Sequence, residues 1–235
     1  ELQLKDLESV EKKLYKYDKM SRTGDKKARK VAEVLTVYKE HLESGQSARS
    51  LLLEEKDKEH VADLMLLTEK PVMYVCNVDE CSIQSGNEYV ERVKSEVSNE
   101  NAAILLIAAS TEADIAELES YEERQMFLED IGLEEPGVNK LIKSAYNLLN
   151  LKTYFTAGVK EVRAWTIKEG MKAPQAAGVI HTDFEKGFIR AEVIKYVDYV
   201  EFGSELACKE AGKMSVEGKD YVVADGDVMH FRFNT

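Results

Sequence analysis

The stretch Pro71–Glu80 reads PVMYVCNVDE, and it decides how the middle of the chain is expected to fold. A proline followed by a nearly continuous apolar run is typical of a buried strand in a parallel sheet. A polar helix is expected next, at 87–97, and the apolar run Ala102–Ala109 predicts a second strand. This alternation of strand and helix indicates an α/β fold with a parallel sheet and right-handed crossovers.

The segment after the second strand continues with helices. Ser110 leads into a helix at 112–118, and Ser120 with Glu123 has the spacing of a capping box for the next helix. Pro136 is expected to begin a further helix. The apolar side chains of that helix share one wide face: Val138, Leu141, Ile142, Ala145, Leu148 and Leu149.

Polar side chains at the ends of the two strands form the predicted binding site. Ligands of parallel sheets bind beyond the carboxyl ends of the strands, where Asn77 and Ser110 lie. An asparagine amide can accept a hydrogen bond from the adenine N6 amino group while it donates to N7. Glu80 could accept from base N–H groups. Asn-x-x-Glu is a weak motif, and an asparagine after a strand is more commonly a turn or helix-cap residue, so both interpretations stay open.

The residues before this region predict an antiparallel helical hairpin. Apolar side chains recur at helical spacing on both sides of a polar turn at 21–25, so each helix would bury its stripe against the other. The first stripe is Leu7, Val10, Leu14 and Tyr17, and the second is Ala28, Val31, Leu35, Tyr38 and Leu42.

The turn of this hairpin is strongly basic. Between Lys12 and Lys30 the net charge is +7, in a chain whose net charge is −12. Such a concentration attracts phosphates through counterion release, so we predict that the tip contacts RNA or the ribosome. A purely structural coiled coil is the alternative interpretation. The residues expected at the contact are Lys19, Arg22, Lys26, Lys27, Arg29 and Lys30.

From Thr153 onward the sequence is rich in strands. Strands are expected at 162–167, 188–194, 221–223 and 228–233, and the turn Asp225-Gly226-Asp227 would join the last two as a hairpin. Helices are expected at 175–180, after Pro174, and near 204–211. A small sheet with a helix across its face indicates a β-grasp fold. Its core would contain Trp165, Phe184, Phe188, Phe231 and Phe233.

The histidines of this part give no metal motif. His181 and His230 have no second or third ligand at metal-binding spacing, so packing or hydrogen-bonding roles are favoured and no metal site is predicted.

The composition is that of a globular protein with one or two domains. The 235 residues are 44% apolar and 32% charged, which is enough apolar material for a core and too much for a disordered chain. No apolar run approaches the ~18–20 residues of a membrane helix, and no secretion signal opens the chain, so a cytoplasmic protein without membrane contact is expected. The acidic average argues against nucleic-acid binding by the whole surface but leaves local basic patches open.

The three cysteines do not form a recognisable framework. Cys76, Cys81 and Cys208 are too few and too unevenly spaced for a disulfide set or a zinc site, which fits a reducing compartment. Cys76 is most simply a small buried residue of the strand. A redox role for Cys81 would rest only on its position beside the predicted base site.

The sequence lacks the motif that binds nucleotide phosphates in P-loop proteins. That motif, GxxxxGK[ST], needs Ser or Thr after a Gly-Lys pair. The only such pairs, Gly212-Lys213 and Gly218-Lys219, have neither that residue nor the preceding glycine. The chain also begins at Glu1, inside a helical pattern and without Met, so we expect it to be part of a longer protein.

Several long runs resemble the C-terminal TGS domain of the YchF family of Obg-related ATPases. They are YFTAG at Tyr154–Gly158, VRAWTI at Val162–Ile167, APQAAGVIHTDFEKGFIRAEV at Ala173–Val193 and VMHFRFN at Val228–Asn234. The helical hairpin, Asn77–Glu80 and the segment at 108–110 follow in the family's order, so the resemblance covers essentially the whole chain.

This resemblance implies a fold and a division into three parts. The fold expected is α/β plus α+β: a helical-hairpin insertion at 1–68, the base-recognition half of a P-loop G domain with a parallel sheet at 69–151, and a ubiquitin-like β-grasp TGS domain at 152–235.

The resemblance also implies a ribosome- and RNA-associated protein that prefers ATP to GTP. We expect a cytoplasmic monomer. Asn77 and Glu80 match its base-specificity motif, Val78 would offer a backbone contact, and Ala109 and Ser110 lie near the loop that closes over the base. The phosphate-binding loop, the switch regions and the groups that hold Mg²⁺ precede the hairpin in the family and are not in this sequence. We therefore expect the longer protein, with Mg²⁺, to be the ATPase, and this chain alone to be inactive. A non-catalytic RNA- or ribosome-binding module is the alternative.

Overall fold

A computed structural model describes residues 1–100, 102–158 and 161–234. The chain divides into two compact units, Glu1–Leu141 and Ile142–Thr235, and each is described by itself. The predicted three-part division of the sequence stays a prediction.

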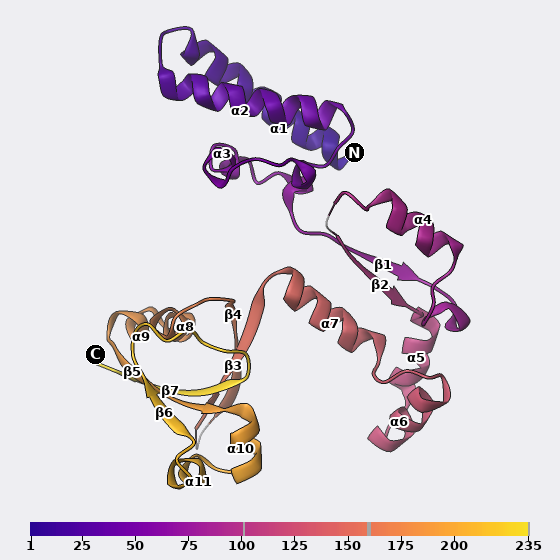
Figure 1. The fold of residues 1–235 in the computed structure, drawn as a ribbon, viewed down its shortest axis with the longest axis vertical. Helices are drawn as coiled ribbons and strands as arrows, with labels where there is room; N and C mark the ends of the chain where they lie inside the picture. The colour runs from indigo at the N-terminus through magenta and orange to yellow at the C-terminus, as the bar shows by residue number, and fades with distance from the viewer. Residues whose placement is uncertain (101, 159–160, 235) are drawn as a thin grey trace. The chain divides into compact units, whose positions relative to one another are not determined.

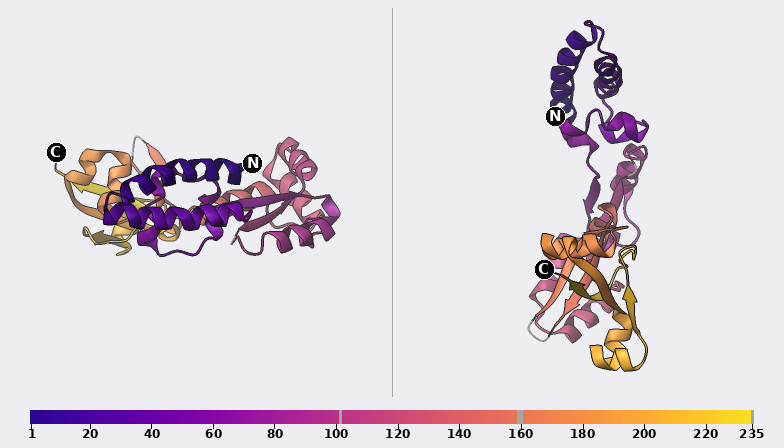
Figure 2. Two further views of the ribbon diagram at one scale, coloured as in Figure 1. Left: turned by 90° about the horizontal axis from the view of Figure 1, so that it is seen from above. Right: turned by 90° about the vertical axis from the view of Figure 1, so that its left-hand side faces the viewer.

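The first unit begins with the expected helical hairpin. Helices α1 (Leu2–Ser21) and α2 (Lys26–Glu43) lie side by side (Figures 1 and 2), and the carboxylate of Asp25 caps α2 by accepting from the N–H groups of Lys27 and Ala28. The predicted stripes form its core, which confirms the helical periodicity. Fully or largely buried there are Val10, Val31, Val34, Leu35, Tyr38 and Leu42, with Leu7, Leu14 and Tyr17 partly buried against them.

A series of short helical turns closes the base of the hairpin. They are η1 (Ala48–Ser50), α3 (Glu55–Lys58), η2 (Ala62–Leu64) and η3 (Leu67–Glu69). Asp6 of α1 is 2% exposed and accepts hydrogen bonds from the N–H groups of Leu67 and Thr68, each at 2.7 Å. The hydroxyl of Thr68 also donates to Asp6 and accepts from the N–H of Ala48. The buried carboxylate therefore connects α1 to η3 directly, and the Thr68 hydroxyl connects η3 to η1.

Two parallel strands follow. β1 (Met73–Asn77) pairs with β2 (Ala103–Ile107) in the register Asn77↔Ile107, with η4 (Glu80–Ser82) and α4 (Glu88–Glu96) between them in the chain (Figure 1). The prediction of parallel strands is confirmed, but the prediction that the first is buried is wrong. Val75 is 46% exposed and Cys76 is only partly buried, in a sheet that has two strands in the described residues. Burial of a strand side chain requires elements that cover the face from which it projects.

Three helices complete this unit and lead into the next. α5 (Ala109–Glu117) begins earlier than expected, since Ala109 already belongs to the helix and not to β2. The capping box of Ser120 and Glu123 is present at the start of α6 (Tyr121–Asp130). For α7 (Gly137–Leu148), the carboxylate of Glu112 accepts from the first N–H groups.

The wide apolar face predicted for α7 is not buried. Val138 is 48% exposed, Ile142 is 52% exposed and Leu149 is 51% exposed. The helical periodicity is correct, but none of these residues belongs to a core cluster of the described residues.

The second unit contains a mixed five-stranded sheet of order β4-β3-β7-β5-β6. Its strands are β3 (Leu151–Ala157), β4 (Val162–Lys168), β5 (Phe188–Lys195), β6 (Met214–Glu217) and β7 (Asp227–Phe233). β3 pairs with β7 in parallel, and the other pairs are antiparallel. Strands β3 and β6 lie outside the ranges expected from the sequence.

Two clusters cover the faces of this sheet. One, beside α8 (Ala173–Ile180) and α9 (Thr182–Lys186), buries Tyr154, Ala177, Phe188 and Phe231, with Trp165 and Phe184 partly buried against it. Phe233 stacks on Phe184 with ring centroids 3.8 Å apart, so the predicted aromatic core is confirmed. A smaller cluster packs around Cys208 beside α10 (Tyr196–Phe202) and α11 (Glu205–Glu210).

The predicted strand at 221–223 and its hairpin are wrong. Val222 forms only an isolated bridge with Lys172. The Asp-Gly turn is instead tied to β3, because Asp225 accepts from the N–H of Thr153 at 2.7 Å and Gly226 donates to the carbonyl of Thr153 at 2.8 Å. These bonds to a distant strand, which local turn rules do not consider, replace those of a hairpin.

No helix in the described part of the chain combines the length and the apolar character that crossing a lipid bilayer requires.

Candidate functional site

The ends of β1 and β2 meet at a polar edge of the two-stranded sheet. Since the strands are parallel and in register, Asn77 ends β1 beside Ile107, which ends β2. The side-chain oxygen Oδ1 of Asn77 accepts a hydrogen bond of 3.0 Å from the N–H of Ala109. The N–H of Val78 donates to the carbonyl of Ile107 at 2.9 Å. The two chain segments that leave the sheet are thereby joined at this edge.

The Asn77 bond has a local structural reason. Ala109 is the first residue of α5, and the preceding residue, Ala108, has no side chain that could cap the helix. The first N–H groups of a helix lack partners within it and favour an oxygen acceptor. Asn77 supplies that acceptor from a neighbouring strand, so it is a helix-capping residue, but for a helix far away in the sequence.

This bond also determines the orientation of the Asn77 amide. Because an N–H group must meet an acceptor, Oδ1 faces Ala109, and the amide nitrogen Nδ2 faces elsewhere with two hydrogens to donate. The Asn77 side chain is exposed, as are Ala109 and Ser110. The structure therefore brings three of the predicted base-site residues to one exposed place.

Glu80 does not take part in the hydrogen bonds at this edge. It opens the short turn η4 and is exposed, and it shares no hydrogen bond with Asn77 in the described residues. Its neighbour Asp79 holds the turn, since Oδ1 of Asp79 accepts from the N–H of Ser82 at 2.9 Å. The side chain of Glu80 remains available to a ligand.

A groove that the sequence did not reveal runs beside this edge. It encloses about 400 Å³ between β1 and α4. Its polar lining residues are Asn77 and Asn87, and the others are Tyr74, Val75, Cys76, Val78, Tyr89, Val90 and Val93. The helical spacing of the α4 residues Tyr89, Val90 and Val93 was the only sequence signal that could have indicated it.

The six basic residues predicted at the hairpin tip are all exposed. Three of them already have acidic partners: Arg22 pairs with Asp18, Arg29 with Glu33 and Lys30 with Asp57. Lys19 lies over the ring of Tyr15, 4.1 Å from its centroid.

The remaining two, Lys26 and Lys27, stand apart from the other four. Neither forms an ion pair within the described residues, so both of these charges at the start of α2 are available to a partner.

The two histidines of the second unit differ from one another. His181 caps α9 through Nδ1, which accepts from the N–H of Asp183, as expected for a hydrogen-bonding residue. The sequence shows no metal-binding spacing around His230, but the fold places Glu192 and Glu205 beside it. A hydrogen bond from Arg232 is the main cause that lowers the pKa of Glu192 below its ordinary value.

Comparison with known proteins shows relatives that are similar to this chain over its whole length. A "Ribosome-binding ATPase YchF" of Bacillus subtilis is 51% identical over 236 residues, which cover 100% of this chain and 64% of that protein. The protein of the same name from Escherichia coli O157:H7 is 49% identical, again over 100% of this chain and 64% of the relative. The chain is a homologue of YchF.

The family model and a solved structure that match this chain also carry the name YchF. A family model named YchF-GTPase_C, described as a protein of unknown function (DUF933), matches residues 151–234. The structure of the Schizosaccharomyces pombe YchF GTPase superposes with a TM-score of 0.84 at 34% identity, covering 98% of this chain and 63% of that one. A GTP-binding protein of Pyrococcus horikoshii, 16% identical with a TM-score of 0.51, shares the fold.

The homology to YchF establishes the fold class of this chain, but it does not establish what the chain binds or hydrolyses. The α/β unit with parallel strands and the unit with a mixed sheet together match the solved YchF structure. The chain spans 64% of the length of the curated YchF relatives, so what those proteins bind or hydrolyse is a matter for a proposal.

Proposed function

We propose that this chain provides the base-recognition half and the ribosome-docking parts of a ribosome-associated nucleotide-binding protein that prefers adenine nucleotides. The observation that carries the proposal is the hydrogen bond from the Ala109 N–H to Oδ1 of Asn77, at the ends of two parallel strands. Ligands of parallel sheets bind at that edge. YchF relatives named as ribosome-binding ATPases support the assignment.

The fixed amide of Asn77 suits a purine. With Oδ1 directed at Ala109, Nδ2 can donate to N7 of the base, and the second lone pair of Oδ1 can still accept from the adenine N6 amino group. The N–H of Val78 is used by Ile107, so only the carbonyl of Val78 could meet the base. Glu80 would accept from base N–H groups, and Ala109 and Ser110 would border the base.

We place the phosphates, Mg²⁺ and the attacking water outside these 235 residues. The sequence has no phosphate-binding motif of the P-loop type. The residues described also leave a sheet edge and an apolar groove of about 400 Å³ beside β1, and an apolar face on α7, where further chain could pack. Mg²⁺ would serve the complete protein, and this chain alone should release no phosphate from ATP above background.

The domain assignment belongs to the same proposal. The five-stranded mixed sheet with α8 across one face supports a TGS domain of β-grasp type at 152–235, of which residues 159–160 and 235 lie outside the described residues. The hairpin at 1–68 would be the coiled-coil insertion, and 69–151 part of a P-loop G domain. We propose a monomer that acts on cytoplasmic ribosomes, without membrane contact.

The decisive experiment separates capping from base recognition at one residue. Asn77→Asp keeps an oxygen acceptor for the Ala109 N–H but removes the N–H donors that would meet N7. We expect saturation-transfer NMR to show contact between the chain and the adenine protons of ATP, less contact with GTP, and a loss of the adenine signal in Asn77→Asp.

Two controls make the outcome specific. Asn147→Ala removes an exposed amide from α7 and should leave the signal unchanged. Amide NMR spectra of Asn77→Asp should show that α5 is intact. An unchanged adenine signal in Asn77→Asp, or equal contact with ATP and GTP, would contradict the proposal.

A second candidate function is an RNA- or ribosome-binding module in which nucleotide plays no part. The basic tip favours it, because Lys26 and Lys27 are exposed and have no acidic partner in the described residues. The same NMR experiment separates the two candidates. A pure binding module would show no adenine contact in the parent chain, so Asn77→Asp would have no signal to remove.

A further inference from the structure

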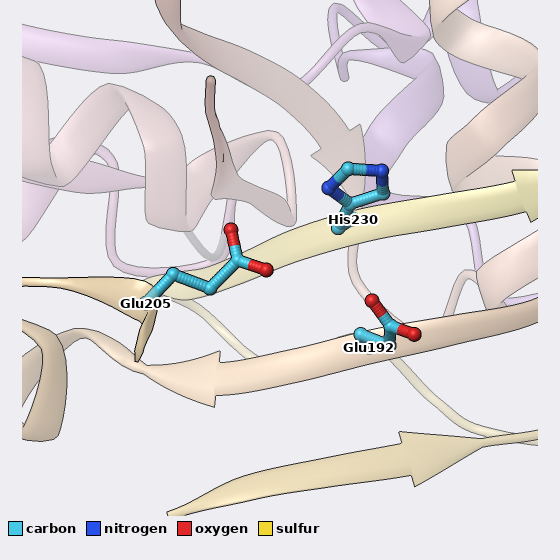
Figure 3. Close-up of side chains that lie close together, drawn as sticks. All are labelled: Glu192, Glu205 and His230. Atoms are coloured by element: carbon cyan, nitrogen blue, oxygen red, sulfur yellow. The ribbon is translucent and has the colours of Figure 1, made fainter. Parts of the chain in front are cut away.

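Three side chains of the kinds that bind metal ions converge on one face of the C-terminal sheet. Glu192 in β5 and His230 in β7 are directly opposed in the antiparallel pair, and Glu205 is the first residue of α11. One ligand atom of each lies within 4.8 Å of the others. Figure 3 shows the two carboxylates gathered around the imidazole of His230.

The positions of these residues follow from the fold. Side chains alternate across a strand, so Ala191 and Val193 point into the buried core while Glu192 points to the opposite face. The same alternation places His230 opposite to the buried Met229 and Phe231. Helix α11 then brings Glu205 over this face.

The three side chains differ in the hydrogen bonds and ion pairs that they already make. The carboxylate of Glu192 accepts from Nη2 of Arg232 at 3.0 Å and lies 3.6 Å from Nη2 of Arg190. By contrast, the side chains of Glu205 and His230 make no hydrogen bond with any described residue. Two carboxylates at this separation repel each other unless a positive charge lies between them.

A small cavity lies at the same place. It has about 10 Å³ of free volume and is lined by all three ligand residues, together with apolar side chains such as Ile194 and Met214. That volume is close to what one water-sized occupant needs, about 10–15 Å³. The cluster is thus both a set of ligands and a space the size of a single ion.

We propose that Glu192, Glu205 and His230 form a site for a divalent transition-metal ion such as Zn²⁺. Imidazole nitrogen with carboxylate oxygens suits zinc, whereas magnesium and calcium prefer oxygen ligands alone. The ion would join β5, β7 and α11, and water would complete its coordination. This site is independent of the base site and of the proposed function.

The site is tested by calorimetric titration of the chelator-treated chain with ZnCl₂. We expect saturable binding of one ion, weakened by at least about tenfold in both Glu205→Gln and His230→Gln. Both residues lie outside the buried clusters of the sheet, so the variants should fold, which amide NMR spectra would confirm.

Matched variants separate this site from other zinc-binding groups. His181→Gln removes a histidine that also has a carboxylate neighbour, Asp183, and should leave the affinity unchanged. Cys81→Ser removes an exposed thiol and should do the same. Arg232→Gln should strengthen binding, because it removes a competing cation from Glu192.

Two results would overturn the proposal. One is the absence of saturable zinc binding, which would mean that the contacts of Arg190 and Arg232 with Glu192 suffice for the cluster without an ion. The other is zinc binding that Glu205→Gln and His230→Gln do not weaken, which would place the ion elsewhere in the chain.

Discussion

At the scale of single residues, Asp6 shows how much one buried carboxylate can hold together. It is 2% exposed and accepts three hydrogen bonds of 2.7 Å, from the N–H groups of Leu67 and Thr68 and from the Thr68 hydroxyl. Buried donors that lose their acceptor cost about 1–3 kcal/mol each. No sequence pattern indicated this role, because its partners lie some sixty positions away.

We expect Asp6→Ala to lower the free energy of unfolding by about 2–3 kcal/mol, since it leaves buried N–H groups without an acceptor. Urea unfolding followed by circular dichroism measures the change. Asp18→Ala, which removes an exposed ion pair with Arg22, is the control and should cost less than about 1 kcal/mol. If both variants lose the same free energy of unfolding, the buried hydrogen bonds of Asp6 stabilise the fold no more than an exposed ion pair does.

Tyr154 is a residue whose burial has a consequence for pH. Its ring is 0% exposed, its hydroxyl donates to the carbonyl of Ala176 at 2.9 Å, and burial raises the pKa of the phenol well above its usual value. A raised pKa in the folded state means that stability is complete below the unfolded pKa, about 10, and is lost as the pH rises beyond it.

We therefore expect the free energy of unfolding to fall above about pH 10, and to fall less steeply in Tyr154→Phe, which has no phenol to ionise. Some alkaline loss should remain, because the pKa of the buried Tyr38 is raised in the same way. Denaturant unfolding at a series of alkaline pH values measures this. Tyr89→Phe, at a 65% exposed ring, should reproduce the parent profile; identical slopes for all three proteins would refute the explanation.

At the scale of elements, local sequence signals were reliable for helices, whose hydrogen bonds join residues close together in the chain. The capping box of α6 and the apolar stripes of α1 and α2 were predicted from spacing and confirmed. The strand at 221–223 was not, because the Asp-Gly turn beside it bonds to Thr153 of β3 and not to a hairpin partner. A strand needs a neighbour, and neighbours are a property of the whole sheet.

The hairpin tip carries the element-scale prediction. We expect Lys26→Glu with Lys27→Glu to weaken binding to ribosomes or single-stranded RNA, and to reduce the dependence of log K on log salt by about 0.7 for each lost phosphate contact. Lys30→Glu should have a smaller effect, because Lys30 already pairs with Asp57. Filter binding at several salt concentrations measures both quantities.

The control for this prediction makes the same change of charge in the second unit. Lys209→Glu with Lys219→Glu replaces two exposed lysines of the second unit and should leave the salt dependence close to the parent value. If the control pair weakens RNA binding as much as the tip pair, net charge rather than the hairpin tip is responsible.

At the scale of the whole molecule, the division into two units indicates that the second can fold alone. Its main core cluster runs from Tyr154 to Phe231 and uses no residue before Ile142. We expect a fragment of residues 142–235 to give a dispersed amide NMR spectrum and to unfold cooperatively in urea. A collapsed spectrum with a broad transition would mean that this unit needs the first one.

Periodicity and motif spacing predicted the helical hairpin, the alternation of strand and helix, the aromatic residues of the core and the asparagine at the end of β1, because each is visible as a pattern of residue types along the chain. The similarity to YchF could be recognised from the sequence because the residues that carry it stand in continuous runs.

Only the tertiary structure decided which groups meet across the chain. The Asn77–Ala109 bond, the Asp6 network and the cluster of Glu192, Glu205 and His230 each join segments that no local rule connects. The exposure of Val75 and of the α7 face was decided there too, since burial depends on what other elements cover and not on how apolar a residue is.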